Sequence, residues 1–320
     1  MKESDFYVLY SHNVAVKGKD KSAIYNLHKG KLTFVPNTLV DVVDALRTTC
    51  IAELRSDIAT DDDRKIFDDY LIFLEKHRLG MFIENPEQFP PMEKIWKNPY
   101  EIISAITEFD CFHQHYDLTE VLMQLDQLTC NFLEIRLYNT DLDYMKKVLK
   151  AIYYSGIRSI NLVLEYMDGL EREITEIYTR NPKLECILVF KSQREIDFSE
   201  IDSIKFTSLT LEDEVLHIDG DEYIINTKYF MEAQHHHPYF NRKVVIDRFG
   251  NLKNDLSFRK IFGNVNGSEI AKLLAETDYK DLWTARPDNV IDYQNDPLRY
   301  CRIYTDNLKK VNGVYTVDKD

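Results

Sequence analysis

A short apolar run of strand length begins at residue 132 and reads Phe132-Leu133-Glu134-Ile135-Arg136-Leu137. A helical pattern follows it around residues 142–154. The order then repeats, because Ser159 to Leu164 precedes a helical pattern around residues 170–180, and a further apolar run spans residues 184–190. Such alternation predicts parallel βα units, arranged as a partial barrel or as an open sheet.

The N-terminal part of the chain has a different pattern. Ala23 to Leu27 and Lys31 to Val35 flank Gly30 and predict a β-hairpin. Three helices are expected next, at Thr38 to Leu46 after a cap at Asn37, at Ile51 to Ile58, and from a cap at Thr60 to about Leu79, where Gly80 ends the third helix and Met81 to Ile83 return as a strand. The order of two strands, three helices and a wing predicts a winged helix.

A proline-rich stretch separates these two patterns. Four of the nine prolines lie between Pro86 and Pro99, a density that neither helices nor strands tolerate. Farther on, Val244 to Leu252 predicts a hairpin around Gly250, and Ser268 to Glu276 predicts a helix. We therefore expect a domain at residues 1–85, a linker at 86–100, a (β/α) domain at 101–230 and a C-terminal region at 231–320.

Composition limits the function. The chain has 320 residues, 44% hydrophobic and 29% charged, and a net charge of −14, which disfavours nucleic acid as a partner. No apolar run reaches the length of a membrane span, and the first residues lack the apolar core of a signal peptide, so we expect a cytoplasmic protein without a membrane partner. Five scattered cysteines show no zinc-ligand spacing and are expected to be reduced. Peptides, proteins and small molecules remain as partners.

Three stretches together carry a family resemblance. They run from Tyr25-Asn26-Leu27 to Phe34-Val35-Pro36-Asn37-Thr38-Leu39, over Glu84-Asn85-Pro86-Glu87-Gln88-Phe89-Pro90, and over Phe240-Asn241-Arg242-Lys243-Val244-Val245-Ile246-Asp247 with Gly250 and Lys253-Asn254. The chain resembles the SPASM-domain peptide maturases of grasp-with-spasm systems and the cysteine-poor pseudo-radical-SAM proteins related to them. This resemblance implies an α/β fold with an N-terminal winged-helix peptide-recognition domain, a partial radical-SAM-like (β/α) barrel and a degenerate SPASM-like C-terminal region.

The cysteines depart from that family. A radical SAM enzyme needs three cysteine thiolates, typically Cx3Cx2C, to hold a [4Fe–4S] cluster. We take Phe132 to Leu137 as the first barrel strand, and the loop that follows it, residues 138–141, has no cysteine. Tyr239, Asp255, Tyr293 and Asp296 stand where cluster-binding SPASM domains have cysteines, and only Cys301 remains nearby. We expect no cluster, no other cofactor and no catalytic residue.

The resemblance implies an accessory role in the maturation of ribosomally made peptides. The chain would bind a precursor (leader) peptide and present it to an ATP-grasp ligase or to a cluster-bearing radical SAM enzyme. In peptide-recognition domains of this kind the leader adds as a strand beside the third strand and rests on the third helix. This mapping assigns peptide binding to Leu32, Thr33 and Phe34 of the strand and to Phe67, Tyr70, Leu71 and Leu74 of the helix.

Two alternatives use other features. His235-His236-His237, with Glu232 or with His113 and His115, would serve a metal-dependent peptide-modifying enzyme, although consecutive histidines in an extended segment alternate sides. The winged helix would serve a DNA-binding regulator. Residues 1–90, however, hold 12 basic against 15 acidic residues, and the third helix begins with Asp61-Asp62-Asp63. We therefore expect neither a metal site nor nucleic-acid binding.

Overall fold

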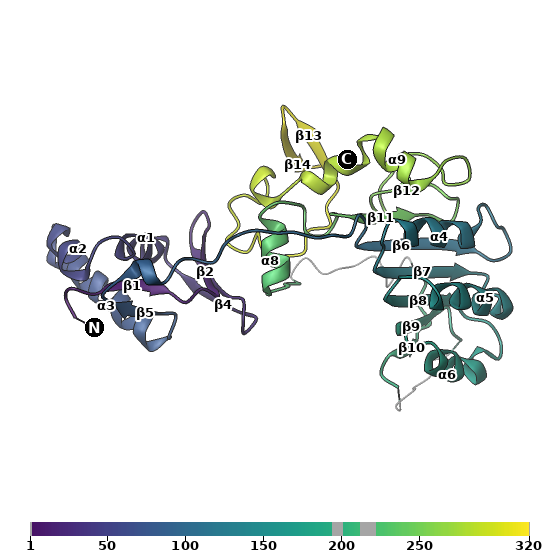
Figure 1. The fold of residues 1–320 in the computed structure, drawn as a ribbon, viewed down its shortest axis with the longest axis horizontal. Coiled ribbons are helices and arrows are strands. Elements are labelled where there is room, and N and C mark those ends of the chain that lie inside the picture. The colour runs from purple at the N-terminus through teal and green to yellow at the C-terminus, as the bar shows by residue number, and fades with distance from the viewer. Residues whose placement is uncertain (1, 194–200, 212–221, 320) are drawn as a thin grey trace. The chain divides into compact units, whose positions relative to one another are not determined.

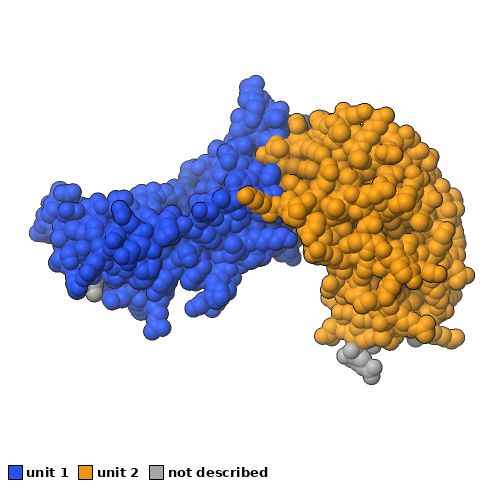
Figure 2. All heavy atoms as spheres, in the orientation of Figure 1, with its two compact units in different colours: residues 1–96, 220–238, 285–320 blue, residues 97–219, 239–284 orange. Residues whose placement is uncertain are grey.

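The computed structural model describes residues 2–193, 201–211 and 222–319. The chain forms two compact units, each made of segments that are far apart in the sequence (Figure 2). Unit 1 comprises Met1–Trp96, Gly220–Pro238 and Ala285–Asp320, and unit 2 comprises Lys97–Asp219 and Tyr239–Thr284.

Unit 2 is a mixed α/β structure built on a largely parallel sheet with the strand order β10-β9-β8-β7-β6-β11-β12 (Figure 1). The predicted alternation of strands and helices is confirmed. The described strands leave the sheet open, which both predicted arrangements allow. Only the pair of β11 and β12, the hairpin predicted around Gly250, is antiparallel among the described strands of this sheet. The elements are β6 (Ser104–Asp110), α4 (Leu118–Gln127), β7 (Phe132–Tyr138), α5 (Leu142–Tyr153), β8 (Ser159–Glu165), α6 (Leu170–Arg180), β9 (Leu184–Phe190), β10 (Ile204–Phe206), β11 (Lys243–Ile246), β12 (Leu252–Lys253), α9 (Ile270–Glu276) and η2 (Asp278–Thr284).

The two faces of this sheet differ in polarity. In β6 the side chains of Ala105, Thr107 and Phe109 are buried and alternate with less buried neighbours. The buried face packs on α4, α5, α6 and α9 in one apolar core, and Figure 1 shows α4, α5 and α6 on one side of the strands. Register places a charged set on the opposite face: Glu108, Glu134, Arg136 and Lys243.

The N-terminal part of unit 1 contains a three-stranded antiparallel sheet in the order β2-β3-β4, three helices and a two-stranded sheet of β1 and β5. The predicted hairpin and the three helices are confirmed, whereas β1 and β2 were not predicted. The assignment of this part as a winged helix stays a prediction. The elements are β1 (Phe6–Leu9), β2 (Asn13–Lys17), β3 (Ser22–Asn26), β4 (Lys31–Val35), α1 (Asn37–Leu46), α2 (Ile51–Asp57), α3 (Asp61–Lys76) and β5 (Gly80–Ile83).

Local signals at the helix ends were only partly right. The Thr60 side chain accepts a hydrogen bond from the Asp63 N–H, so the predicted cap of α3 is confirmed. Asn37 does not cap α1; it lies inside the helix and its side chain accepts from the Ser22 hydroxyl. Gly80 does not end α3, which stops at Lys76. It lies in β5, where a Cβ would come within 2.1 Å of the Val8 carbonyl oxygen.

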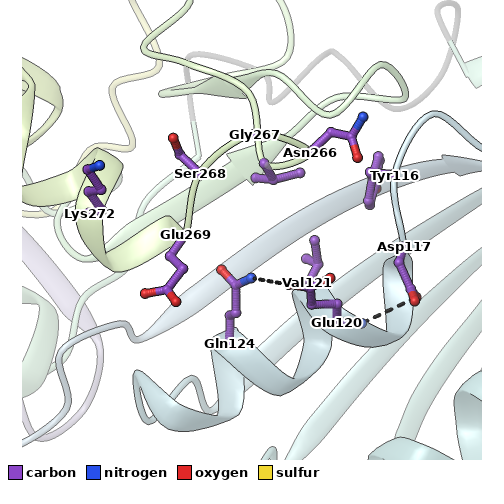
Figure 3. A pocket seen from close by; sticks show the side chains of 11 residues that line it. Tyr116, Asp117, Glu120, Val121, Gln124, Asn266, Gly267, Ser268, Glu269 and Lys272 are labelled. Atoms are coloured by element: carbon purple, nitrogen blue, oxygen red, sulfur yellow. Dashed lines mark hydrogen bonds between the residues drawn. The ribbon is translucent and has the colours of Figure 1, made fainter.

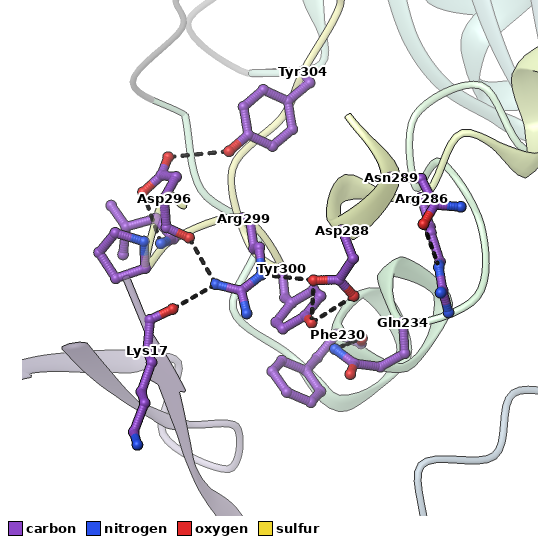
Figure 4. Close-up of polar contacts among 12 residues, drawn as sticks. Lys17, Phe230, Gln234, Arg286, Asp288, Asn289, Asp296, Arg299, Tyr300 and Tyr304 are labelled. Atoms are coloured by element: carbon purple, nitrogen blue, oxygen red, sulfur yellow. Dashed lines mark hydrogen bonds and ion pairs between the residues drawn. The ribbon is translucent and has the colours of Figure 1, made fainter. Parts of the chain in front are cut away.

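The C-terminal segment of unit 1 makes polar contacts with the three-stranded sheet of β2, β3 and β4, and Figure 4 shows those around Arg299. Arg299 donates from Nη1 to the Lys17 carbonyl at 2.7 Å and from Nε to Asp288 at 2.9 Å. The buried Tyr25 hydroxyl donates to the Pro297 carbonyl at 2.7 Å. The contacts to Lys17 and Tyr25 connect the C-terminal segment to the N-terminal part of unit 1. The remaining elements of unit 1 are η1 (Pro86–Gln88), α8 (Thr227–Ala233), η3 (Pro287–Asn289), β13 (Leu308–Val311) and β14 (Val314–Val317).

The proline-rich stretch forms one short 3-10 turn, η1, and no further helix or strand before β6. Across the described ranges, no helix is both long enough and apolar enough to cross a membrane.

Candidate functional site

The free edge of β4 is the first feature of the site. Two main-chain hydrogen bonds just beyond the strand ends show which residues of β3 bond to β2. The Leu27 N–H donates to the His12 carbonyl, and the Gly18 N–H donates to the Lys21 carbonyl. In an antiparallel ladder, hydrogen-bonded pairs alternate with non-bonded pairs. Ala23 and Tyr25 therefore turn their main-chain groups toward β2, and Ile24 turns its groups toward its partner Thr33 in β4.

Because of this alternation, the three strand residues assigned to peptide binding do not all direct their main-chain groups to the same side of β4. The N–H and C=O of Thr33 are used within the sheet, so Thr33 cannot pair with an added strand. The N–H and C=O groups of Leu32 and Phe34 point away from β3, toward the side where the described sheet ends. The opposite edge is partly covered, because Lys17 C=O accepts from Arg299 and Lys19 N–H donates to Asn295. The open edge of this sheet is therefore β4.

The helix residues assigned to peptide binding fall into two groups. Phe67, Leu71 and Leu74 are at most 3% exposed and fill the core between α3, α1 and the sheet. They cannot contact a peptide without unfolding that core. Tyr70 is half-buried, and its hydroxyl lies 2.6 Å from the Thr38 Oγ1, three residues beyond the end of β4. Tyr70 thus places the neighbouring surface of α3 next to that end of β4.

Two residues that the sequence analysis missed extend this surface. Ile66 and Phe73 lie one turn before and one turn after Tyr70 on the same side of α3, and Ile66 is 48% exposed. Apolar residues at spacing i, i+4 and i+7 that remain partly open to solvent form an apolar wall on α3, and the contact of Tyr70 with Thr38 brings this wall to the residues that follow β4. The signal was present in the sequence, because Ile66 and Phe73 are apolar residues at helical spacing from Tyr70; Ile66 is exposed and Phe73 packs partly against the core.

The third helix also bears on nucleic-acid binding. Asp61, Asp62 and Asp63 are exposed at its start, and Asp69 is exposed in its middle. Carboxylates on the outer surface repel phosphates. The geometry therefore gives no support to a DNA-binding role.

The structure corrects the position of the first parallel strand. β6 precedes β7 in the chain and pairs with it, so Phe132 to Leu137 is not the first parallel strand, and the loop after the first described parallel strand is residues 111–117 and not 138–141. It contains Cys111, His113 and His115. Cys111 is buried, and burial raises the pKa of its thiol to about 11, so it is a neutral thiol near neutral pH. One protonated thiol does not fit a cluster that requires three thiolates.

The four residues that the resemblance aligns with SPASM cysteines contact other groups of the protein itself. In unit 2, Lys243 is 3.6 Å from the Asp255 carboxylate and lies 3.8 Å from the centre of the Tyr239 ring. In unit 1, Asp296 accepts from Arg302 and from the Tyr304 hydroxyl, both at 3.0 Å, and Tyr293 stacks on Tyr304. Each position contributes to a polar or aromatic contact, so none of them presents a soft ligand to a metal.

The histidine-rich segment does not converge on one point. His235 Nε2 lies 2.7 Å from the Lys94 carbonyl oxygen, the His236 ring packs on Trp96 at 4.9 Å, and His237 is fully buried. Within the described ranges, no three side chains of His, Cys, Asp and Glu are grouped to hold a metal ion. The metal-enzyme alternative therefore has no geometric support.

The described residues of unit 2 also line several cavities. One, of about 230 Å³, includes Glu108, Arg136 and Tyr138 at the carboxyl ends of β6 and β7. Burial raises the pKa of Glu108, opposed by Arg136 and by a hydrogen bond from the Tyr138 hydroxyl at 3.0 Å. Arg136 in turn binds Glu134 at 2.6 Å. These groups satisfy one another and form a structural network.

A second cavity, of about 530 Å³, lies between α4 and the loop that leads into α9 (Figure 3). Asp117, Glu120, Glu269 and Lys272 are among its lining residues. Asp117 caps α4, and Gln124 accepts a hydrogen bond from the Ile270 N–H at 2.8 Å. No cysteine or histidine is among the lining residues, so the cavity supplies neither a thiolate nor an imidazole.

Comparison with known proteins gives few matches. No protein-family model matches the chain, and no curated protein matches it. Among solved structures, BtrN in an open conformation is 11% identical, with 63% of this chain and 93% of that chain covered and a TM-score of 0.37. SuiB of Streptococcus suis bound to S-adenosylmethionine is 11% identical, with 94% of both chains covered and a TM-score of 0.30. A second SuiB structure is 10% identical, covers 90% of this chain and 88% of that chain, and has a TM-score of 0.25. TM-scores this low carry no argument about fold or function.

Proposed function

We propose that this protein binds the leader segment of a ribosomally made precursor peptide as an added strand on β4 and presents the peptide to a separate modifying enzyme. The observation that carries the proposal is the free edge of β4, with the main-chain groups of Leu32 and Phe34 directed outward. Strand addition takes its affinity from such main-chain hydrogen bonds and its specificity from pockets for alternate side chains.

The surroundings of the edge support this use. The partly exposed wall of α3 formed by Ile66, Tyr70 and Phe73 supplies an apolar surface for side chains on one side of an added strand. Beneath that wall, Phe67, Leu71 and Leu74 are buried in one continuous hydrophobic core. A rigid scaffold beside an open edge limits the reorganisation that binding requires.

The modifying chemistry belongs, in this proposal, to a partner. The partner is an ATP-grasp ligase or a cluster-bearing radical SAM enzyme, as the sequence resemblance implies. The chain itself is a catalytically degenerate radical-SAM-like protein, since its cysteines do not fit a cluster and its described cavities hold no activated nucleophile.

Hydrogen–deuterium exchange with a candidate precursor peptide tests the proposal. Saturating peptide should slow exchange of the Leu32 and Phe34 amides, while the Thr33 amide, already bonded within the sheet, should change little. Protection confined to unit 2, or no protection under conditions where binding is measured, would refute peptide addition at β4. A pull-down with a candidate ATP-grasp ligase or radical SAM enzyme, with and without the peptide, tests presentation.

A further inference from the structure

The sheet that carries the free edge has a charge opposite to that of the whole protein. Residues 17–31 contain five lysines and one aspartate, within a chain whose net charge is −14. Lys17 pairs with Asp41. In the described part of the chain, no carboxylate is paired with the remaining four, which are all exposed: Lys19, Lys21, Lys29 and Lys31.

These lysines flank both ends of β4. Lys29 and Lys31 lie at the hairpin turn where β4 begins. Lys21 precedes β3, and its ammonium lies 4.0 Å from the centre of the Phe34 ring near the other end of β4. Phe34 is 47% exposed, so the surface around it is open to an added strand.

Successive side chains of an added strand point to opposite faces of the sheet, and these two faces differ in their neighbouring residues. Ile24 and Val35 belong to the core under α1 and α3, so the side chain of Thr33, the partner of Ile24, is directed to the α3 face. Phe34 is opposite Ala23 and lies on the other face, with Lys21. Successive residues of the added strand therefore alternate between the face of Thr33, on which α1 and α3 pack, and the face of Phe34 and Lys21.

We infer that the segment bound at β4 is acidic, with carboxylate side chains on the face of Lys21 and Phe34 and apolar side chains on the face of α3. The inference rests on the proposed strand addition and names the chemistry of the peptide. Asp62 and Asp69, exposed on α3, disfavour the reverse orientation because they would repel acidic side chains placed on that face.

The test uses three synthetic peptides with the cores Leu-Glu-Val-Glu-Leu, Leu-Gln-Val-Gln-Leu and Leu-Lys-Val-Lys-Leu, labelled for fluorescence anisotropy against the full chain. The wild-type protein should bind the Glu peptide about two- to fivefold more tightly than the Gln peptide, because an exposed ion pair contributes modestly. The Lys peptide should bind weakest, and the preference should shrink at high salt.

Charge reversal at one lysine provides the decisive comparison. Lys21→Glu should reverse the order of the Glu and Lys peptides, whereas Lys65→Glu, the same charge change at an exposed position on α3, should preserve it. An unchanged preference in Lys21→Glu, equal binding of the three peptides by the wild type, or binding of none of them overturns the inference. Phe34→Pro tests the edge separately: if it binds the Glu peptide at wild-type affinity, strand addition fails even where the charge preference persists.

Discussion

Replacing Phe34 with proline removes one outward N–H from β4. Edge strands tolerate proline where the missing N–H faces solvent, so the ladder between β3 and β4 should survive. Phe34→Ala is the matched control, since it removes the same exposed ring and keeps the N–H. The difference in peptide affinity between the two variants therefore isolates one main-chain hydrogen bond.

The expected loss of peptide affinity is set by the peptide carbonyl that no longer has a hydrogen-bond donor. A peptide carbonyl that is desolvated without its donor costs about 1–3 kcal/mol. That cost corresponds to a Kd for Phe34→Pro about 5- to 150-fold weaker than for Phe34→Ala. Thr33→Pro should instead lose the bond to Ile24 within the sheet, so its penalty of about 1–3 kcal/mol falls on the free energy of unfolding.

Fluorescence anisotropy with the labelled precursor peptide measures the first effect, and urea unfolding followed by circular dichroism measures the second. Equal affinity of Phe34→Pro and Phe34→Ala, with both proteins folded, would show that the Phe34 N–H does not pair with the peptide. Wild-type stability of Thr33→Pro would show that the pairing phase of β4 is wrong.

Three further predictions concern stability and chemistry. Burial lowers the pKa of Lys243 from 10.5 to about 8, so the folded state binds this proton less tightly than the unfolded state does. The free energy of unfolding should therefore rise by up to about 3 kcal/mol between pH 8 and pH 10.5. Urea unfolding of Lys243→Met should lack that rise. Tyr25→Phe leaves the Pro297 carbonyl without its 2.7 Å donor and should lower the free energy of unfolding by about 1–3 kcal/mol, read from the urea midpoint, whereas an unchanged midpoint would contradict the contact. After anaerobic reconstitution with iron and sulfide the protein should hold no stoichiometric iron and should not cleave S-adenosylmethionine, because Cys111 is a buried neutral thiol in the loop after β6; a charge-transfer band in the visible spectrum would contradict this.

The sequence alone determined the elements whose causes are local. The hairpin around Gly30 and the strands and helices from Phe132 to Phe190 follow from the periodicity of apolar residues, which neighbouring positions set. Thr60 likewise caps α3 through a contact three residues away. The absence of a thiolate triad needed only the count and the spacing of cysteines.

Tertiary structure decided which side chains and main-chain groups remain available to contact a bound peptide. The resemblance assigns Phe67, Leu71 and Leu74 to peptide binding, but they pack in the core with α1 and the sheet, whereas Ile66 is exposed and Phe73 is half-buried. The sequence cannot say which main-chain groups of β4 are free, because adjacent residues alternate and only the register with β3 sets the phase. β1 was missed because a four-residue strand carries little periodicity of its own. It pairs with β5 across more than seventy residues, and such a partner is found only when the chain folds.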